Sequence, residues 1–169
     1  VGRGDVRLWQ RLAEQGLEGV PVRPIVGVDE PWYYRNKMEF SFGDNPHAPF
    51  ALGMHPIGYR HDVLALEACH IQSEFTSAFL PRIRDWARDA GYEPLLNRQR
   101  TGFLKNLLIR EGKRTGERLV ELVTTSDEVA VIAGEELSPR EAAARFCEAA
   151  YDLAAELGGV ITSFYWTQH

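Results

Sequence analysis

The sequence is poor in the residues that disulfide scaffolds and metal clusters need. Its 169 residues include only two cysteines, Cys69 and Cys147. Two cysteines allow at most one disulfide, and this count favours a reducing compartment. We therefore expect a cytoplasmic protein. No uninterrupted apolar run approaches the roughly 20 residues of a membrane-spanning helix, and the most apolar stretch, 103–123, is broken by basic residues. No membrane partner is expected.

Glycine-rich loops for phosphate or for a methyl donor are also missing. The pair Gly2 and Gly4 lacks the third glycine and the preceding strand of a dinucleotide-binding loop. No glycine loop is followed by Lys-Ser or Lys-Thr. We therefore expect no nucleotide or methyl-donor pocket in this chain.

The composition is that of a globular protein, but its charge is unevenly distributed. Apolar residues make up 44% and charged residues 25% of the chain, and the net charge is −5, which argues mildly against a nucleic-acid partner. Segment 97–118 nevertheless has seven basic residues against two acidic ones. The basic residues are Arg98, Arg100, Lys105, Arg110, Lys113, Arg114 and Arg118. The acidic surplus falls mostly in 121–156, so the average charge does not exclude a local nucleic-acid surface.

Hydrophobic periodicity predicts an α+β fold. A period of two, or a short apolar run, predicts strands at 34–42, 50–55, 62–66, 103–110, 118–125 and 160–166. Helical spacing predicts two main helices at 73–90 and 138–157, and a short helix at 6–15. The order β-β-β-α-β-β-α-β is dominated by hairpins, so we expect an antiparallel β-sheet with two helices packed on it. Residues 1–30 are expected to form a leading segment with the short helix, and 31–169 the main domain.

Two local clusters could bind a ligand. Arg35 and Lys37 share one face of the first predicted strand, with Trp32 and Tyr34 close by in sequence. Basic residues beside aromatic ones suit phosphate pairing and base stacking. The alternative is that these cations solvate the outer face of a sheet while the aromatics fill the core.

The second cluster contains possible metal ligands. His55, His61, Cys69 and His70 lie close in sequence, but their spacing fits no common zinc finger. The favoured interpretation is a set of loop histidines with a semi-buried cysteine. An independent metal-binding domain remains the alternative. Cys147 lies in the second main predicted helix and is expected to pack against the core.

Three segments carry a family resemblance. Residues 32–43 read Trp-Tyr-Tyr-Arg-Asn-Lys-Met-Glu-Phe-Ser-Phe-Gly, 52–55 read Leu-Gly-Met-His and lead to Cys-His-Ile-Gln at 69–72, and 101–112 contain Gly-Phe-Leu-Lys-Asn. In this order they resemble the central domain of the RNA uracil-C5 methyltransferases. That family uses S-adenosylmethionine to make 5-methyluridine in tRNA and 23S rRNA.

The resemblance implies a larger parent enzyme. The parent would bind S-adenosylmethionine and, in many members, a [4Fe–4S] cluster for which Cys69 looks like the fourth ligand. The other three cysteine ligands, the N-terminal domain and the C-terminal catalytic domain have no counterpart in this sequence. We therefore expect no cofactor in this chain, assign no catalytic residue, and expect the chain alone to be inactive.

The resemblance also implies a role in binding RNA, either tRNA or 23S rRNA, next to flanking domains of the parent. The candidate phosphate contacts are Arg35, Lys37, Lys105 and Arg110. The candidate stacking residues are Trp32, Tyr34 and Phe103. The alternative function is a structural or protein-interaction module that supports a neighbouring domain.

Overall fold

The computed structural model describes residues 3–24, 26–96 and 98–169. The chain forms two compact units, Val1–Pro31 and Trp32–His169. The first contains α1 (Arg3–Glu14), which ends at Gly16 with a φ of 69°. The Leu17 N–H donates to the Leu12 carbonyl over 2.9 Å, which closes the last helical turn. Among the described residues, no helix is long and apolar enough to cross a membrane.

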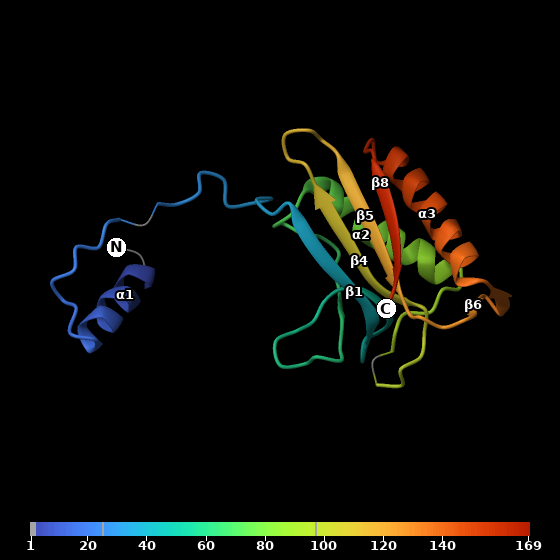
Figure 1. The fold of residues 1–169 in the computed structure, drawn as a ribbon, viewed down its shortest axis with the longest axis horizontal. Coiled ribbons are helices and arrows are strands. Elements are labelled where there is room, and N and C mark those ends of the chain that lie inside the picture. The colour runs from blue at the N-terminus through green and yellow to red at the C-terminus, as the bar shows by residue number, and fades with distance from the viewer. Residues whose placement is uncertain (1–2, 25, 97) are drawn as a thin grey trace. The chain divides into compact units, whose positions relative to one another are not determined.

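The described part of the second unit contains a six-stranded sheet, a small hairpin and two helices (Figure 1). Its elements are β1 (Lys37–Asn45), β2 (Ala48–Met54), β3 (Leu64–Ala65), α2 (Glu74–Asp89), β4 (Leu104–Glu111), β5 (Arg118–Thr124), β6 (Ala130–Ile132), β7 (Glu135–Leu137), α3 (Pro139–Glu156) and β8 (Ser163–Gln168). The sheet order is β3-β2-β1-β4-β5-β8. The predicted α+β class, with a mostly antiparallel sheet and two main helices packed on it, is confirmed.

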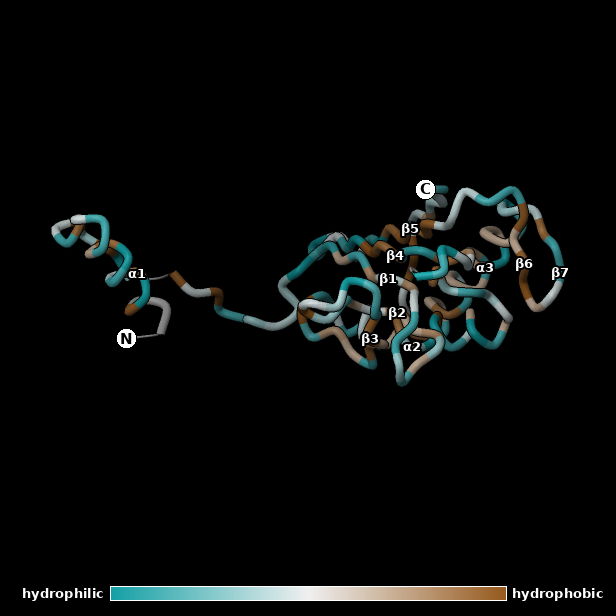
Figure 2. The backbone as a smooth tube through the Cα atoms, turned by 90° about the horizontal axis from the view of Figure 1, so that it is seen from below, coloured by the Kyte–Doolittle hydropathy of each residue, from teal (hydrophilic) through white to brown (hydrophobic). Residues whose placement is uncertain are grey.

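Two features differ from the sequence-based expectation. β8 pairs with β5 in parallel, because α3 carries the chain back to the end of the sheet where β5 begins. The hairpin β6–β7 was not predicted. Its turn places Ala133 and Gly134 at φ values of 51° and 82°, and Ala-Gly lacks the usual signature of such a turn. In Figure 2 the tube is hydrophobic along β6 and largely hydrophilic along β7.

One face of the sheet forms the core. Phe40 and Phe42 of β1 are fully buried and alternate with polar residues on the opposite face. Figure 1 shows α2 behind the large strands and α3 to the right of β8. Phe146 of α3 is also fully buried and makes edge-on ring contacts with Phe42 and with Trp86 of α2. The two helices and the sheet therefore share one hydrophobic core.

The start of α2 is set by a side-chain cap. The Ser73 hydroxyl accepts a hydrogen bond from the Thr76 N–H over 2.9 Å. The helix thus begins about two turns before Pro81, which lies inside it. This cap fixes the position of Ser73, and it becomes important at the site described below.

The buried phenol of Tyr92 predicts an alkaline dependence of stability. Burial raises the pKa of Tyr92 to about 12, and its hydroxyl donates to the Ala142 carbonyl over 2.8 Å. The folded-state pKa thus exceeds the ordinary value of about 10. The contribution of the neutral, buried phenol to the free energy of unfolding is therefore fully present below about pH 10. It is lost as the pH rises toward about 12. Urea unfolding should therefore show a falling free energy over this range, and Tyr92→Phe should remove that part of the slope. An unchanged slope in Tyr92→Phe would contradict this.

Candidate functional site

Lys37 and Arg110 form a cross-strand pair of like charges. They lie directly opposite each other in the antiparallel β1–β4 register, and both are exposed on the face of the sheet away from the helices. Cβ atoms of directly opposite residues are about 5 Å apart, and like charges at that spacing repel each other. Within the described part of the chain, neither side chain has a hydrogen-bond or ion-pair partner. An anion placed between them would relieve the repulsion.

A hollow of about 460 Å³ lies beside this pair. Its lining comprises Asn36, Lys37, Arg110, Glu111, Gly112, Glu117, Leu119, Thr162 and Ser163. Leu119 lies opposite Arg110, and Ser163 lies opposite Leu119, so one row of residues crosses four strands. The Thr162 hydroxyl donates to the Arg118 carbonyl over 2.8 Å, which holds it at the rim. Two cations and two hydroxyls thus face one polar hollow, with Glu117 as its exposed carboxylate.

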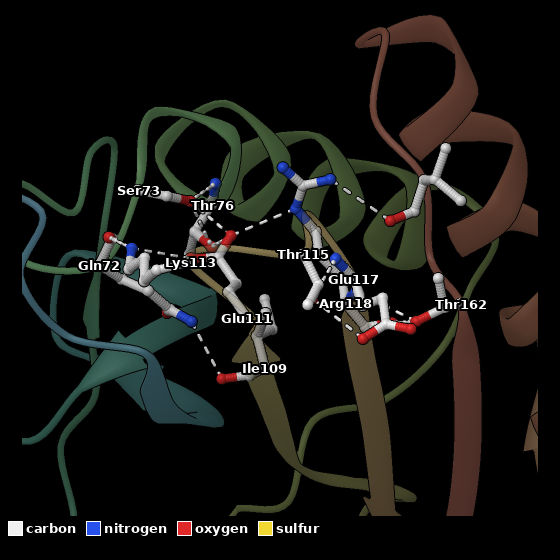
Figure 3. A network of polar contacts seen from close by, with 11 residues as sticks. Gln72, Ser73, Thr76, Ile109, Glu111, Lys113, Thr115, Glu117, Arg118 and Thr162 are labelled. Carbon is white, nitrogen blue, oxygen red and sulfur yellow. Dashed lines mark hydrogen bonds and ion pairs between the residues drawn. The ribbon is translucent and has the colours of Figure 1, made fainter.

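On the helix side of the same strand end, Glu111 is the centre of a polar network (Figure 3). Its side chain is only 6% exposed. It accepts a 2.6 Å hydrogen bond from the Ser73 hydroxyl and a 3.3 Å contact from Arg118 Nε. Lys113 Nζ lies 3.4 Å from the carboxylate and also donates to the Gln72 carbonyl. The network ties the β4–β5 hairpin to the capped start of α2.

This network shows that several cations of the basic segment 97–118 form contacts within the fold. Lys113 and Arg118 balance Glu111, and the Arg118 guanidinium also lies 4.0 Å from the centre of the Phe75 ring. Arg98 pairs with Asp62 over 2.8 Å. Three of the seven basic residues of segment 97–118 therefore form ion pairs within the fold. Arg110 points to the other face of the sheet, which explains why it stays available to a ligand.

The four predicted phosphate contacts do not gather in one place. Lys37 and Arg110 are adjacent, whereas the Arg35 guanidinium contacts the sulfur of Met38 at 3.3 Å, and Met38 is buried on the core side. Lys105 lies in an irregularity of the β4–β5 register and its amino group contacts His169 Nδ1. At about 3.3 Å per residue, it is about 16 Å from Arg110 along the strand. Only the Lys37–Arg110 pair forms a common site.

The predicted stacking residues also separate. Trp32 is 58% and Tyr34 56% exposed. Phe103 is 4% exposed and packs 6.4 Å from the Tyr92 ring, measured between centroids. Phe103 is thus a core residue, and its assignment as a stacking residue is wrong. It lies just before β4, next to the fully buried Leu104.

The possible metal ligands are dispersed. His55 Nδ1 lies 2.9 Å from the Asp62 carbonyl, and the His70 ring packs against Trp32 and Tyr33. No group of three potential ligands occurs among the residues that the structure describes. An independent metal-binding domain has no support in this geometry.

The two cysteines do not fit an iron–sulfur cluster held by this chain alone. Cys69 is buried, and its N–H and carbonyl are both bonded to the Ser77 hydroxyl at 2.8 Å. Cys147 lies in α3 and is half-buried, and burial raises the pKa of its thiol. Such a cluster is usually held by four thiolates. The sequence also carries no glycine-rich loop for a methyl donor, and no chemical step is assigned to either group here.

The sequence did not identify Thr162 and Ser163, which line the far side of the hollow. The signal was present as an alternation of Ser163, Tyr165 and Thr167 with Phe164 and Trp166. It was not informative alone, because the partner strand and its direction were unknown. The parallel β5–β8 register places Ser163 beside the cationic pair.

No protein-family model matches the chain, but individual proteins do. A protein of Clostridium tetani (strain Massachusetts / E88), named as an uncharacterized RNA methyltransferase, is 38% identical over 120 residues. A protein of Chlorobaculum tepidum with the same description is 32% identical over 124 residues. The chain belongs to the RNA methyltransferase family. The matched regions cover 70% and 65% of this chain but 26% of each relative, so the chain spans about a quarter of the length of these RNA methyltransferases.

A solved structure shows a similar fold. It is the Pyrococcus abyssi tRNA (uracil-54, C5)-methyltransferase in complex with S-adenosyl-L-homocysteine. The TM-score is 0.50 at 17% identity, over 59% of this chain and 24% of that one. At this identity the likeness shows a shared fold alone.

Proposed function

We propose that this chain supplies an RNA-binding surface to an S-adenosylmethionine-dependent RNA uracil-C5 methyltransferase of the cytoplasm. It positions the RNA, while flanking domains of the parent bind the methyl donor and perform the transfer. The resemblance implies tRNA or 23S rRNA as the substrate, and Cys69 would complete a cluster whose other three thiolates come from the parent. The observation that carries the proposed role in RNA binding is the unpaired Lys37–Arg110 pair beside a polar hollow.

The geometry suits a phosphate of the RNA backbone. Arg110 can give two parallel N–H donors to phosphate oxygens, and Lys37 adds a point charge from the neighbouring strand. Ser163 offers a hydroxyl group at the far side of the hollow. The Glu117 carboxylate accepts from the Thr115 hydroxyl over 2.9 Å at the hairpin end, and its charge would repel a phosphate placed there. The phosphate is therefore expected over the strands rather than over the hairpin.

Replacing Lys37 or Arg110 with alanine should weaken RNA binding and reduce its dependence on salt. Each lost phosphate contact should lower the slope of log affinity against log salt by about 0.7 for a single strand. Fluorescence anisotropy of the 169-residue chain with a labelled single-stranded RNA, titrated at several salt concentrations, measures both quantities.

Arg140→Ala is the matched control, because Arg140 is an exposed cation in the first turn of α3, on the helix layer. It should leave the salt slope unchanged. In the whole parent enzyme, Lys37→Ala with Arg110→Ala should raise KM for RNA more than it lowers kcat for 5-methyluridine formation. A chain that does not bind RNA at low salt, or a pair whose loss has no more effect than Arg140→Ala, would refute the proposed role.

A further inference from the structure

The sheet face that carries the Lys37–Arg110 pair also carries an exposed aromatic ring. In the next row, two residues along the strands, Leu108 lies between Glu39 and Glu121 and is only 9% exposed. Tyr165 of β8 lies beside Glu121 in the same row and is 56% exposed. Among the described residues of Trp32–His169, both large helices lie on the opposite side of the sheet, as Figure 1 shows.

The charges on this face change sign between neighbouring rows. The row of Arg110 is cationic, whereas the next row carries Glu39 and Glu121 at the sides of Leu108. Thr167 donates to Glu121 over 2.7 Å and holds that carboxylate in place. A phosphate would be attracted to the first row and repelled by the second. A polyanion on this face must therefore turn its uncharged parts toward the row that contains Tyr165.

The spacing fits a nucleic-acid strand with unstacked bases. β8 lies about 10 Å from β4, and the two rows are about 7 Å apart along the strands. A short stretch of unpaired strand can bridge that distance with its phosphate on the cations and a base on the tyrosine ring. Bases stack on aromatic side chains whatever their identity, whereas the bases of a duplex remain stacked on one another. The face therefore suits unpaired nucleotides.

We propose that the open sheet face binds unpaired RNA, with one base stacked on Tyr165 while the adjacent backbone lies on the Lys37–Arg110 pair. This inference rests on the proposed function and specifies the form of RNA that the surface takes. Tyr165 acts through its ring face, and its hydroxyl is not required. The carboxylates of Glu39 and Glu121 keep the phosphates away from the row that contains Tyr165.

The test uses the 169-residue chain and a labelled oligouridylate of about ten nucleotides. Tyr165→Ala should weaken binding roughly 5- to 100-fold, which corresponds to the loss of one base–aromatic stack, and should leave the salt slope unchanged. Tyr165→Phe should bind within about twofold of the unmodified chain, because the ring remains. Tyr151→Ala is the matched control, since Tyr151 is a 40% exposed tyrosine on α3. Since both tyrosines are exposed, these variants should fold, and circular dichroism checks this.

The outcomes separate the two proposals. Equal affinity of Tyr165→Ala and Tyr151→Ala, together with weaker binding by Lys37→Ala, would overturn the stacking role and leave the RNA-binding function standing; the face would then be better explained as a contact for a protein domain. A duplex of the same length that binds as tightly as the single strand would overturn the preference for unpaired RNA. Absence of RNA binding by the unmodified chain would refute both.

Discussion

Phe146→Ala should lower the free energy of unfolding by about 3–5 kcal/mol. Phe146 is fully buried, and its ring contacts aromatic rings from the sheet and from α2. It also lies 6.0 Å from the Tyr92 ring and 6.5 Å from the Phe164 ring of β8, between centroids. Alanine would leave a cavity at the place where the sheet, α2 and α3 meet. Urea unfolding followed by circular dichroism measures the loss.

Two further variants on α3 serve as controls for this prediction. Tyr151→Ala removes a partly exposed ring that packs against Phe164, and should cost less than about 1 kcal/mol. Phe146→Leu keeps much of the buried volume and should fall between the two alanine variants. Similar losses for Phe146→Ala and Tyr151→Ala would mean that Phe146 does not join the layers.

Glu111→Ala should lower the free energy of unfolding by about 2–4 kcal/mol. The substitution removes the acceptor of the Ser73 hydroxyl and leaves two cations without their counter-charge. The side chain of Arg118 is 21% and that of Lys113 37% exposed. Water can therefore partly solvate these two cations. The loss of stability should for this reason be smaller than for a fully buried ion pair. Urea unfolding of the variant measures it.

The control is an ion pair of the same charge type at the surface. Arg82 and Glu156 pair over 3.2 Å with side chains that are 49% and 59% exposed. Glu156→Ala should change stability by less than about 1 kcal/mol. Glu111→Ala should also weaken RNA binding, because the network fixes the hairpin beside the Lys37–Arg110 pair. A stability loss no larger than that of Glu156→Ala would remove Glu111 from this role.

The elements that follow one hydrophobic period were predictable from the sequence. Ser138, Pro139 and Glu141 predicted the start of α3, and the structure contains both hydrogen bonds of the capping box. β1 was predicted because its core and solvent residues alternate from Lys37 to Phe42. The direction of β8 was not predictable, because a strand pattern is the same in parallel and antiparallel pairs. The turn at Ala133 adopts positive φ without the residues that usually announce it.

The candidate site was predictable where a side chain and its partner lie on adjacent strands. Lys37 and Arg110 were selected separately from their motifs, and the register brings them together. Charge counting could not separate Arg110 from Arg118, since the two differ only in the face of the sheet they occupy. That difference depends on the pairing of β4 with β5 and on the buried Glu111. Tyr165 was missed because its neighbours depend on the direction of β8, which the strand pattern alone does not reveal.

The parallel pairing of β8 also sets the order in which the protein can assemble during synthesis. Arg118 and Thr162 are bonded although 44 residues separate them, and α3 must be made before β8 can reach β5. Until then the outer edge of β5 has no partner in the sheet, and such an edge invites pairing with other chains. Contacts this distant in sequence also slow folding. The hollow beside the Lys37–Arg110 pair, whose far wall is Thr162 and Ser163, therefore cannot form until β8 has been made and has paired with β5.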